Sequence, residues 1–491
     1  MPLSGWANYL VPMFHGNTRN MGGVFFQYEQ LWTSSYYLGI GTLCVALMAV
    51  MEPYEKRIRF LVALALVAFI FALGEHTPIY PALRNILPAL SLITYPIKYV
   101  LLITFSVPLL AAFALARFDR QLPGSRRKIV IITVVLLALI GGIVYWAVRF
   151  PMAGDNPHAI IINGLSRAGI LILACGLVIV MLLKHGSGLS RMASLVLILV
   201  AWLDVWTHEP QQNPTVSPTV YEPGLAREKL AMDPQPELGG SRAMMSPMGF
   251  YNFVHSAISD PQNCFLVGRM AYGADANLLD AVPQTGGFFS LIPRECDDFQ
   301  LLLYGANNAG YPALEDFMGV SQITASDQIY HWQSRTNYMP LVTAGQKPVF
   351  LSDTVLSQAL QMSGFDPRRF VLLPLDEKSL VTISNQASAQ VLSSKFDTQS
   401  VEAQVQASGP ALVVISQTYY HDWHAFMDGM PTPLLRANDA FQAVQVPAGK
   451  HEMRLVYADN AFQAGAAISI CAWAVCIAGA FFGRKKESAK I

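Results

Sequence analysis

Long apolar runs separated by short polar segments fill the first part of the chain, and one more run lies near its end. A helix needs roughly 17–25 mainly apolar residues to cross the hydrocarbon core of a membrane. The third, fourth and seventh runs meet this length, whereas the second and sixth are shorter and would also suit buried interfacial helices. Apolar runs that cluster in this way require one shared apolar environment, which a lipid bilayer provides. The pattern therefore predicts a polytopic α-helical membrane protein with about seven spans. The runs are 36–51, 60–74, 99–116, 129–148, 168–183, 192–206 and 461–483.

Lysine and arginine are distributed unevenly over the segments between the runs. Fourteen lie on one side: Lys56, Arg57, Arg59, Arg117, Arg120, Arg126, Arg127, Lys128, Lys184, Arg191, Arg484, Lys485, Lys486 and Lys490. The four on the other side are Arg84, Lys98, Arg149 and Arg167. Short loops rich in these residues stay in the cytoplasm. The pattern therefore predicts a multi-pass protein of the plasma membrane with a six-helix bundle at 36–206, a last span at 461–483 and a cytoplasmic tail at 484–491.

The same topology places the polar and aromatic segment 1–35 outside the cell. No signal sequence or apolar span precedes it. A short tail of this kind can be translocated by the helix that follows it. The simpler interpretation is that Met1 is not the natural start of the complete protein, and that the chain is a fragment.

The composition changes abruptly after Trp206, where an extracytoplasmic domain is expected at 207–460. Residues 208–236 are rich in Pro, Gln, Asn and Glu, which is typical of a linker. Short strands and turns follow, and the pattern becomes sharp only from about 397 to 458. There, alternating segments are joined by tight turns such as Met427-Asp428-Gly429. The expected domain is α+β, rich in β-structure, and ends in a small β-sandwich.

Composition and charge exclude several classes of function. Charged residues make up 13% of the chain, against about 25% in soluble domains. Lysine plus arginine equals aspartate plus glutamate, 33 against 33, so nothing in the net charge indicates a nucleic-acid partner. The sequence contains no glycine-rich phosphate loop and no cysteine spacing typical of zinc, and no metal site is expected.

The polar segment between the second and third runs is the first candidate site. It contains Glu75, His76, Arg84 and Lys98, together with four prolines that preclude a long regular helix. Irregular backbone beside a membrane is usually tolerated where it lines a cavity in the protein. Cations next to such a cavity suit a lipid phosphate, so Arg84 and Lys98 are predicted to bind one. The alternative is that both side chains only reach for lipid headgroups.

Asp204 is the second candidate, near the end of the sixth run between Trp202 and Trp206. An acid within a span is a functional hypothesis by default, and we group Asp204 with Glu75 and His76 as a polar cavity. The alternative is that Asp204 faces water or caps the end of its helix.

Cys264 and Cys296 are the only cysteines of the expected outer domain, where the compartment permits disulfides. We predict a disulfide between them, which would close a loop of about 30 residues in a segment with few apolar runs. The alternative is that Cys264 and Cys296 are two buried thiols that form no bridge.

Several strings of the sequence resemble the YfhO family of bacterial membrane proteins. They are YYLGIGTL, ALGEHTPIYPALRNILPAL, TYPIKYVLLITFSVPLLAAFAL, DFMGVSQI, YYHDWHAFMDG and LRANDAFQAVQVPAGKHEMRLVYADNAFQAG. The resemblance is strongest around Trp423, Asp428, Gly429, Pro447, Gly449, His451 and Tyr457. The family is similar to GT-C-type glycosyltransferases, which take sugars from polyprenyl-phosphate carriers.

The chain departs from the family's pattern at two places. Lys98 is the single cation in a segment that is usually rich in arginine in the family. The acidic catalytic motif of GT-C enzymes, in their first outer loop, has no counterpart here, so no catalytic residue is nominated. On this resemblance, a divalent metal would be a cofactor of the complete enzyme and not of this chain alone.

The resemblance implies that the chain is the C-terminal portion of a membrane glycosyltransferase, inactive by itself. It would transfer sugar from a polyprenyl-phosphate donor to a glycan or lipid of the cell envelope on the outer face. The alternative is a non-catalytic envelope protein whose outer domain binds a glycan or a partner.

Overall fold

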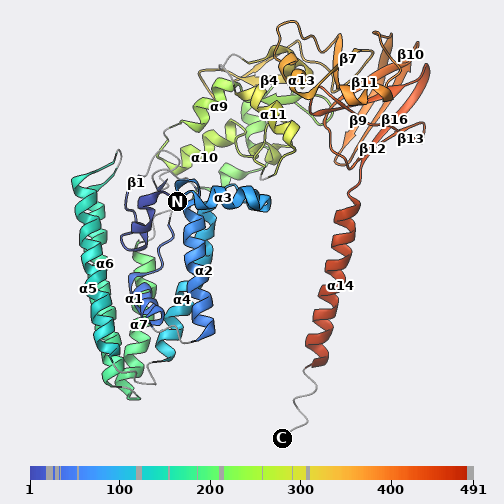
Figure 1. Ribbon diagram of the computed structural model, residues 1–491. Helices are drawn as coiled ribbons and strands as arrows, with labels where there is room; N and C mark the ends of the chain where they lie inside the picture. Colours follow the sequence, from blue (N-terminus) through green and yellow to red (C-terminus); the bar gives the residue numbers. More distant parts are fainter. Residues whose placement is uncertain are drawn as a thin grey trace. The chain divides into compact units, whose positions relative to one another are not determined.

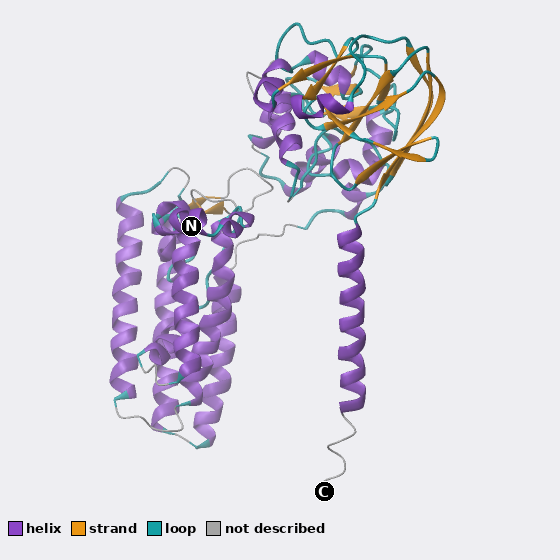
Figure 2. Ribbon diagram, turned by 45° about the vertical axis from the view of Figure 1, so that its right-hand side comes forward, coloured by secondary structure: helices purple, strands orange, loops and turns teal. Residues whose placement is uncertain are grey.

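The chain forms two compact units, shown in Figures 1 and 2. The computed structural model describes residues 1–17, 26–27, 32–33, 35–51, 55–117, 124–152, 155–184, 186–208, 215–256, 258–289, 291–305 and 310–483. The first unit, which we call the bundle unit, comprises Met1–Val216 and Ala257–Cys264. The second, the sheet unit, comprises Ser217–Ser256 and Phe265–Ile491.

Long apolar helices make up most of the bundle unit. They are α2 (Lys56–Leu73), α4 (Val100–Ala116), α5 (Ser125–Arg149), α6 (Pro157–Leu183) and α7 (Gly188–His208). With α14 (Asn460–Gly483) of the sheet unit, the described residues contain six helices long and apolar enough to cross a membrane. The prediction of a polytopic helical membrane protein with a β-rich domain is therefore confirmed. The second and sixth runs form full-length helices because flanking polar residues extend them.

The first apolar run is the exception among the seven. Its helix, α1 (Ile40–Val50), has 11 residues. At 1.5 Å per residue it covers about 16 Å, roughly half of the hydrocarbon core. It lies inside the bundle, packed mainly against α4 and also against α5, α6 and α7. Gly41 permits this position, since a Cβ atom there would lie 3.1 Å from the Cβ of Ala174 on α6.

The other spans present most of their apolar surface outward. Within the bundle, 22% to 39% of each candidate span is buried in the protein. Side chains such as Leu101, Leu165 and Leu195 are each about 70% exposed. This is the pattern of a bundle whose surroundings are as apolar as its interior.

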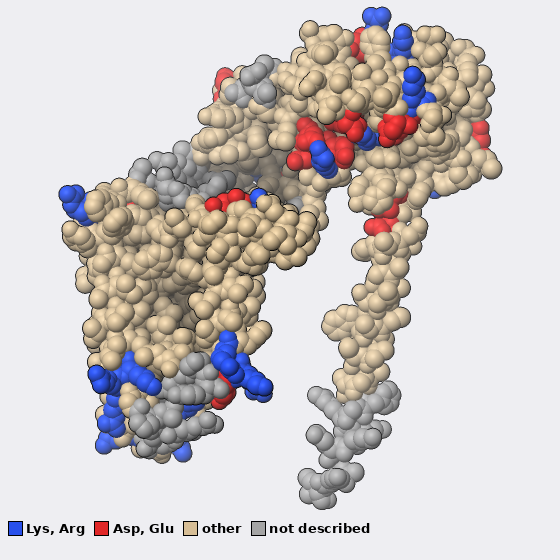
Figure 3. All heavy atoms as spheres, in the orientation of Figure 1, with Lys and Arg blue, Asp and Glu red and all other residues tan. Residues whose placement is uncertain are grey.

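Lysine and arginine gather at one end of the bundle (Figure 3). The beginnings of α2, α5 and α7 and the ends of α4 and α6 meet at this end, which we call the basic end. The opposite end carries short pieces: η1 (Leu3–Tyr9), β1 (Gly16–Asn17), β2 (Phe26–Gln27), η2 (Gly74–His76), α3 (Ile79–Ile86), η3 (Pro88–Leu92) and η4 (Pro96–Tyr99). The four prolines thus interrupt the backbone between α2 and α4 as expected.

Two sheets form a sandwich in the sheet unit. One has the strand order β13-β12-β16-β10-β9 and the other β14-β15-β11-β6, with a shared apolar core between them. The strands are β6 (Val342–Ala344), β9 (Ala389–Asp397), β10 (Ser400–Ala407), β11 (Ala411–Thr418), β12 (Trp423–Met427), β13 (Met430–Thr432), β14 (Leu435–Ala437), β15 (Phe441–Val446) and β16 (Gly449–Tyr457). The sandwich extends beyond the expected 397–458, because β6 and β9 join its two sheets.

The pattern of buried and exposed residues along the strands explains why the sandwich is predictable from the sequence. Burial along β10 alternates, as expected for a strand with one face in the core. The strand β11 is buried at its first six positions and lies between β15 and β6. Asp428 and Gly429 have φ of 48° and 81° in the turn between β12 and β13, the left-handed conformation that an Asp-Gly hairpin needs.

The remainder of the sheet unit mixes short helices with two small sheets, β3-β4-β5 and β7-β8. Its helices are α8 (Leu225–Leu230), α9 (Pro247–Val254), α10 (Pro261–Met270), η7 (Ala276–Asp280), α11 (Arg294–Tyr304), α12 (Pro312–Phe317) and α13 (Asp353–Ala359), and its strands are β3 (Arg242–Met244), β4 (Val320–Thr324), β5 (Trp332–Ser334), β7 (Lys347–Leu351) and β8 (Phe370–Pro374). A second apolar core lies under α11, α12 and α13.

The predicted disulfide is wrong, because Cys264 and Cys296 both carry thiols. The side chain of Cys296, on α11, packs against the second core, and its Sγ lies 3.9 Å from Oγ1 of Thr418 on β11. Burial raises the pKa of this thiol. Core contacts therefore order the segment that the disulfide was expected to hold.

Candidate functional site

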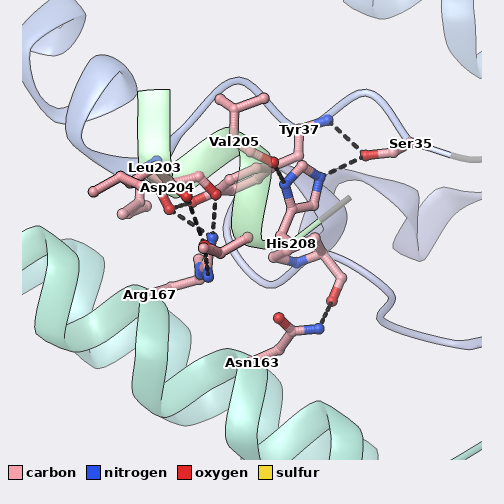
Figure 4. A network of polar contacts seen from close by, with 11 residues as sticks. Ser35, Tyr37, Asn163, Arg167, Leu203, Asp204, Val205 and His208 are labelled. Carbon is pink, nitrogen blue, oxygen red and sulfur yellow. Dashed lines mark hydrogen bonds and ion pairs between the residues drawn. The ribbon is translucent and has the colours of Figure 1, made fainter. Parts of the chain in front are cut away.

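A buried ion pair joins two membrane-spanning helices inside the bundle (Figure 4). Arg167 Nη1 donates to Asp204 Oδ1 at 2.6 Å and to the Asp204 carbonyl at 2.5 Å. The two side chains are 2% and 0% exposed, so both charges are removed from solvent. Arg167 is the eleventh residue of α6, about 15 Å from the start of that helix. The pair therefore lies well inside the bundle.

The carboxylate of Asp204 also anchors the start of α1. Its Oδ2 accepts hydrogen bonds from Ile40 N at 2.7 Å and from the Tyr37 hydroxyl at 3.0 Å. Ile40 is the first residue of α1, so Asp204 satisfies one of the donors that a helix start leaves unpaired. Gly39 has φ of 86°, and a Cβ there would lie 3.2 Å from Oδ2. Glycine therefore suits both the turn and the close approach.

A histidine–serine contact completes the group, which we call the Arg167 network. His208 Nδ1 lies 2.6 Å from the carbonyl of Val205 and must carry the hydrogen, because a carbonyl only accepts. Its Nε2 then accepts from the Ser35 hydroxyl at 3.1 Å. The Tyr37 ring packs on His208 at 4.4 Å, and Arg167 Nη2 donates to Thr207 at 3.2 Å.

The Arg167 network holds the non-helical segment 35–39 within the bundle. Irregular backbone at membrane depth is tolerated where it is buried in protein and its polar groups find partners. Asp204 has bonds from α1, α6 and Tyr37, so it is a structural acid in this conformation. Glu75 and His76 lie elsewhere, exposed in η2, and none of the contacts between described residues joins them to Asp204.

Arg167 was not singled out in the sequence, although a signal was present. The apolar runs predict that Arg167 lies between two spans, but the structure places it within α6. A lone arginine in one apolar helix and a lone aspartate in the next is a pattern that favours an intramembrane pair.

A second buried pair, His15 with Asp155, holds the segment before β1. Nδ1 of His15 lies 2.7 Å from Asp155 Oδ2, and the two side chains are 3% and 2% exposed. Asn163 of α6 donates to the carbonyl of Pro12 at 3.1 Å, and Asn8 exchanges two hydrogen bonds with Phe14. The Nε2 of His15 has no partner among the described residues. Because both side chains are buried, the pair is a structural contact within the bundle unit.

The two predicted phosphate-binding cations have different surroundings. Lys98, in η4, is exposed, and its Nζ lies 5.4 Å from the Tyr95 ring and 5.8 Å from the Trp32 ring. These two rings stack at 3.9 Å. Arg84, in α3, forms an exposed ion pair with Glu75 at 2.9 Å. Both cations lie in the short pieces between α2 and α4, at the end of the bundle opposite the basic end.

A cavity of about 630 Å³ lies elsewhere in the bundle, between α1, α4 and α7. Its lining is mainly apolar, with Arg191 and Ser190 at the basic end of α7. None of Glu75, His76 and Asp204 contributes to it. No group of three metal-ligating side chains occurs among the residues that the structure describes.

A cluster of carboxylates surrounds Arg436 in the sheet unit. The guanidinium bonds Asp353 at 2.6 Å and Asp439 at 3.2 Å, while Glu377 accepts from Arg436 N at 3.0 Å. Burial raises the pKa of Asp439 to about 6, and neighbouring carboxylates add to this while Arg436 opposes it. Burial also raises the pKa of Glu377. The cluster ties β14 and β15 to α13 and the segment after β8.

The fold thus defines a multi-pass membrane protein in which a β-sandwich precedes the last span. Comparison with known families adds one finding: the model described as "Bacterial membrane protein YfhO" matches residues 322–469. This segment runs from β4 through the sandwich into α14. The expected resemblance to the YfhO family is therefore confirmed over this part of the chain. No curated protein and no solved structure matches.

The residues that carry the resemblance most strongly build the sandwich. Trp423 and Tyr457 are cross-strand partners of β12 and β16, with rings 5.6 Å apart. His451 lies 2.6 Å from Asp428 at the adjoining hairpin, where a hydrogen bond from Glu452 N, with that from His451, lowers the pKa of Asp428. The residues that carry the resemblance therefore lie in the strands and turns of the sandwich.

We expect loss of Arg167 to destabilise the bundle strongly. Changing Arg167 to Met leaves Asp204 buried without its cation, which typically costs roughly 3–5 kcal/mol. The matched control is Arg84→Met, which breaks the exposed pair with Glu75 and should cost at most about 1 kcal/mol. Thermal unfolding of the full chain in detergent measures both. Equal shifts in Tm would contradict a structural role for the buried pair.

The raised pKa of Asp439 predicts a pH dependence of the sheet unit. Between about pH 4 and 6 the folded state holds a proton on Asp439 that the unfolded state releases. This group therefore favours the folded state at the acidic end of that window, and its contribution is lost as the pH rises. Asp439→Asn should flatten the dependence of Tm on pH, whereas Asp327→Asn, at an exposed carboxylate, should leave it unchanged. An unaltered slope in Asp439→Asn would exclude this carboxylate as its source.

Proposed function

We propose that this chain is the C-terminal portion of a membrane glycosyltransferase that takes sugar from a polyprenyl-phosphate carrier on the outer face. The acceptor is a glycan or lipid of the cell envelope. The observation that carries the proposal is the exposed Lys98 ammonium beside two stacked aromatic rings, at the end of the bundle opposite the basic end. The resemblance to a family of bacterial membrane proteins supports the class.

The distribution of cations supports the orientation that this function requires. Nine of the lysines and arginines that the structure describes lie at or beside the basic end: Lys56, Arg57, Arg59, Arg117, Arg126, Arg127, Lys128, Lys184 and Arg191. Positive charge in short loops favours the cytoplasmic side. In this orientation Lys98, Arg84 and the sheet unit are extracytoplasmic, where a flipped carrier lipid presents its phosphate.

Lys98 has the chemistry for a lipid phosphate. An ammonium attracts a phosphate as a point charge and offers three donors, and no acidic partner of Lys98 occurs among the described residues. Trp32 and Tyr95 add an amphipathic surface of the kind found at membrane interfaces. Arg84 is the second cation in this proposal, and it would exchange its exposed bond to Glu75 for the phosphate at little cost.

Removal of Lys98 should abolish donor binding without unfolding the protein. In the complete enzyme, Lys98→Ala is expected to lower glycan modification at least tenfold, Arg84→Ala to lower it less, and Lys98→Arg to retain part of it. The control is Arg149→Ala, since Arg149 is an exposed cation at the same end and lies 5.5 Å from the Phe150 ring. Protein level is measured in parallel. Unchanged modification in both Ala variants would reduce Lys98 and Arg84 to membrane anchors.

The proposed orientation predicts which positions an impermeant thiol reagent reaches in intact cells. In a chain whose six cysteines are replaced by alanine, Ser394→Cys on β9 should be labelled directly. Ser187→Cys, beside the basic end, should be labelled only after the membrane is permeabilised. The opposite pattern would reverse the topology and exclude an outer-face reaction for this chain.

A further inference from the structure

The helical part of the sheet unit exposes large apolar side chains that no function discussed above requires. We call this set the apolar surface. Its members, with their exposed fractions, are Phe250 46%, Tyr251 50%, Val254 51%, Leu278 74%, Phe288 67% and Phe289 59%. Scattered exposed leucines are normal on a soluble domain, whereas a gathering of apolar side chains marks a surface that meets another apolar phase.

Contacts beneath these residues show that their segments are neighbours. Phe253, on α9, packs against Gly273, where a Cβ would lie 2.4 Å from the ring. Phe250 lies 5.6 Å from the Tyr304 ring, and the Tyr304 hydroxyl bonds Thr285 at 2.7 Å. Asp275 Oδ1 accepts from Phe288 N at 2.8 Å. The helix α9, the turn after α10 and the segment 285–289 therefore form one side of the unit.

Charge is sparse in the segment 243–293, which carries this side of the unit. Between positions 243 and 293 the sequence has one lysine or arginine, Arg269, and it is 1% exposed in an ion pair with Asp280. Asp275 is engaged with the backbone of Phe288, and Asp260 is the remaining acid. A surface without exposed cations does not attract phosphates or acidic polymers. Its chemistry instead suits the region between lipid headgroups and acyl chains, where aromatic side chains gather.

The chain itself keeps this unit at a membrane. The strand β16 ends at Tyr457 and α14 begins at Asn460, so only Ala458 and Asp459 separate the sandwich from a helix that is long and apolar enough to span. Two extended residues bridge about 7 Å.

We propose that the apolar surface is immersed in the interface of the lipid bilayer, so that the sheet unit rests on the membrane as well as being tethered to it. The partner is lipid, because the adjoining span brings a bilayer within reach and the surface offers apolar area without charge. Membrane contact of this kind does not depend on glycosyl transfer.

Spin-label accessibility in the full chain tests the proposal. Nitroxides are attached to Leu278→Cys and to Phe289→Cys in a cysteine-replaced chain, reconstituted into nanodiscs of phosphatidylethanolamine and phosphatidylglycerol. Collisions with oxygen, which partitions into lipid, are compared with collisions with a water-soluble nickel chelate. The matched controls are Val355→Cys and Met362→Cys, at apolar side chains that are 42% and 62% exposed in and just beyond α13.

We expect the labels at 278 and 289 to meet oxygen more than nickel, and the control labels to meet nickel more than oxygen. Free access of nickel at 278 and 289 would place the apolar surface in water and overturn the proposal. Protection from both reagents would indicate a protein partner and would equally overturn it.

A second variant addresses cooperation across the surface. Phe288→Ser combined with Phe289→Ser should raise nickel access at a label on Tyr251→Cys severalfold, since the remaining residues would lose their hold on the interface. Val355→Ser should leave that label unchanged. An unaltered label in the double variant would show that the surface does not insert as a unit.

Discussion

The bundle depends on the pairing of Arg167 with Asp204. Moving either charge alone from water into a low-dielectric interior costs several kcal/mol, and mutual attraction repays this only when further hydrogen bonds satisfy both groups. Here Asp204 accepts hydrogen bonds from the backbone of α1 and from the Tyr37 hydroxyl, and Arg167 donates a further bond to the carbonyl of Asp204. The pair therefore fixes three helices and a non-helical segment at once. The start of α1 and the path of residues 35–39 follow from this one constraint.

The same physics separates what could be read from the sequence from what could not. Apolar runs and alternating strands are local patterns, so the fold class and the sandwich near the C-terminus were predictable. The length of α1 was not, because its start is set by a carboxylate 164 positions later. Arg167 was misassigned for a related reason, since a cation ten residues into a long helix resembles a loop cation when the helix start is placed too late.

The structure gives the predicted site residues surroundings that differ from those expected, and each difference has a physical reason. Asp204 is a buried acid whose partners lie on α1, on α6 and at Tyr37, and none of the contacts between described residues joins it to Glu75 or His76. Lys98 and Arg84 remain proposals, since both lie in short helical pieces whose arrangement no periodicity specifies. The disulfide prediction failed because the spacing of two cysteines gives only the length of the loop between them. It does not give the directions in which their side chains point. Cys296 points into a core under α11, which the thin apolar pattern of that segment had concealed.

The shortness of α1 has a consequence for how the protein is made. A segment of about 16 Å cannot cross the hydrocarbon layer by itself, and the partners of its first turn lie on helices synthesised more than a hundred residues later. The hydrogen bonds that anchor the first turn of α1 therefore form only after α6 and α7 have been synthesised. Biogenesis of this bundle is consequently a long-range event, in which the anchoring of α1 depends on residues that are synthesised much later.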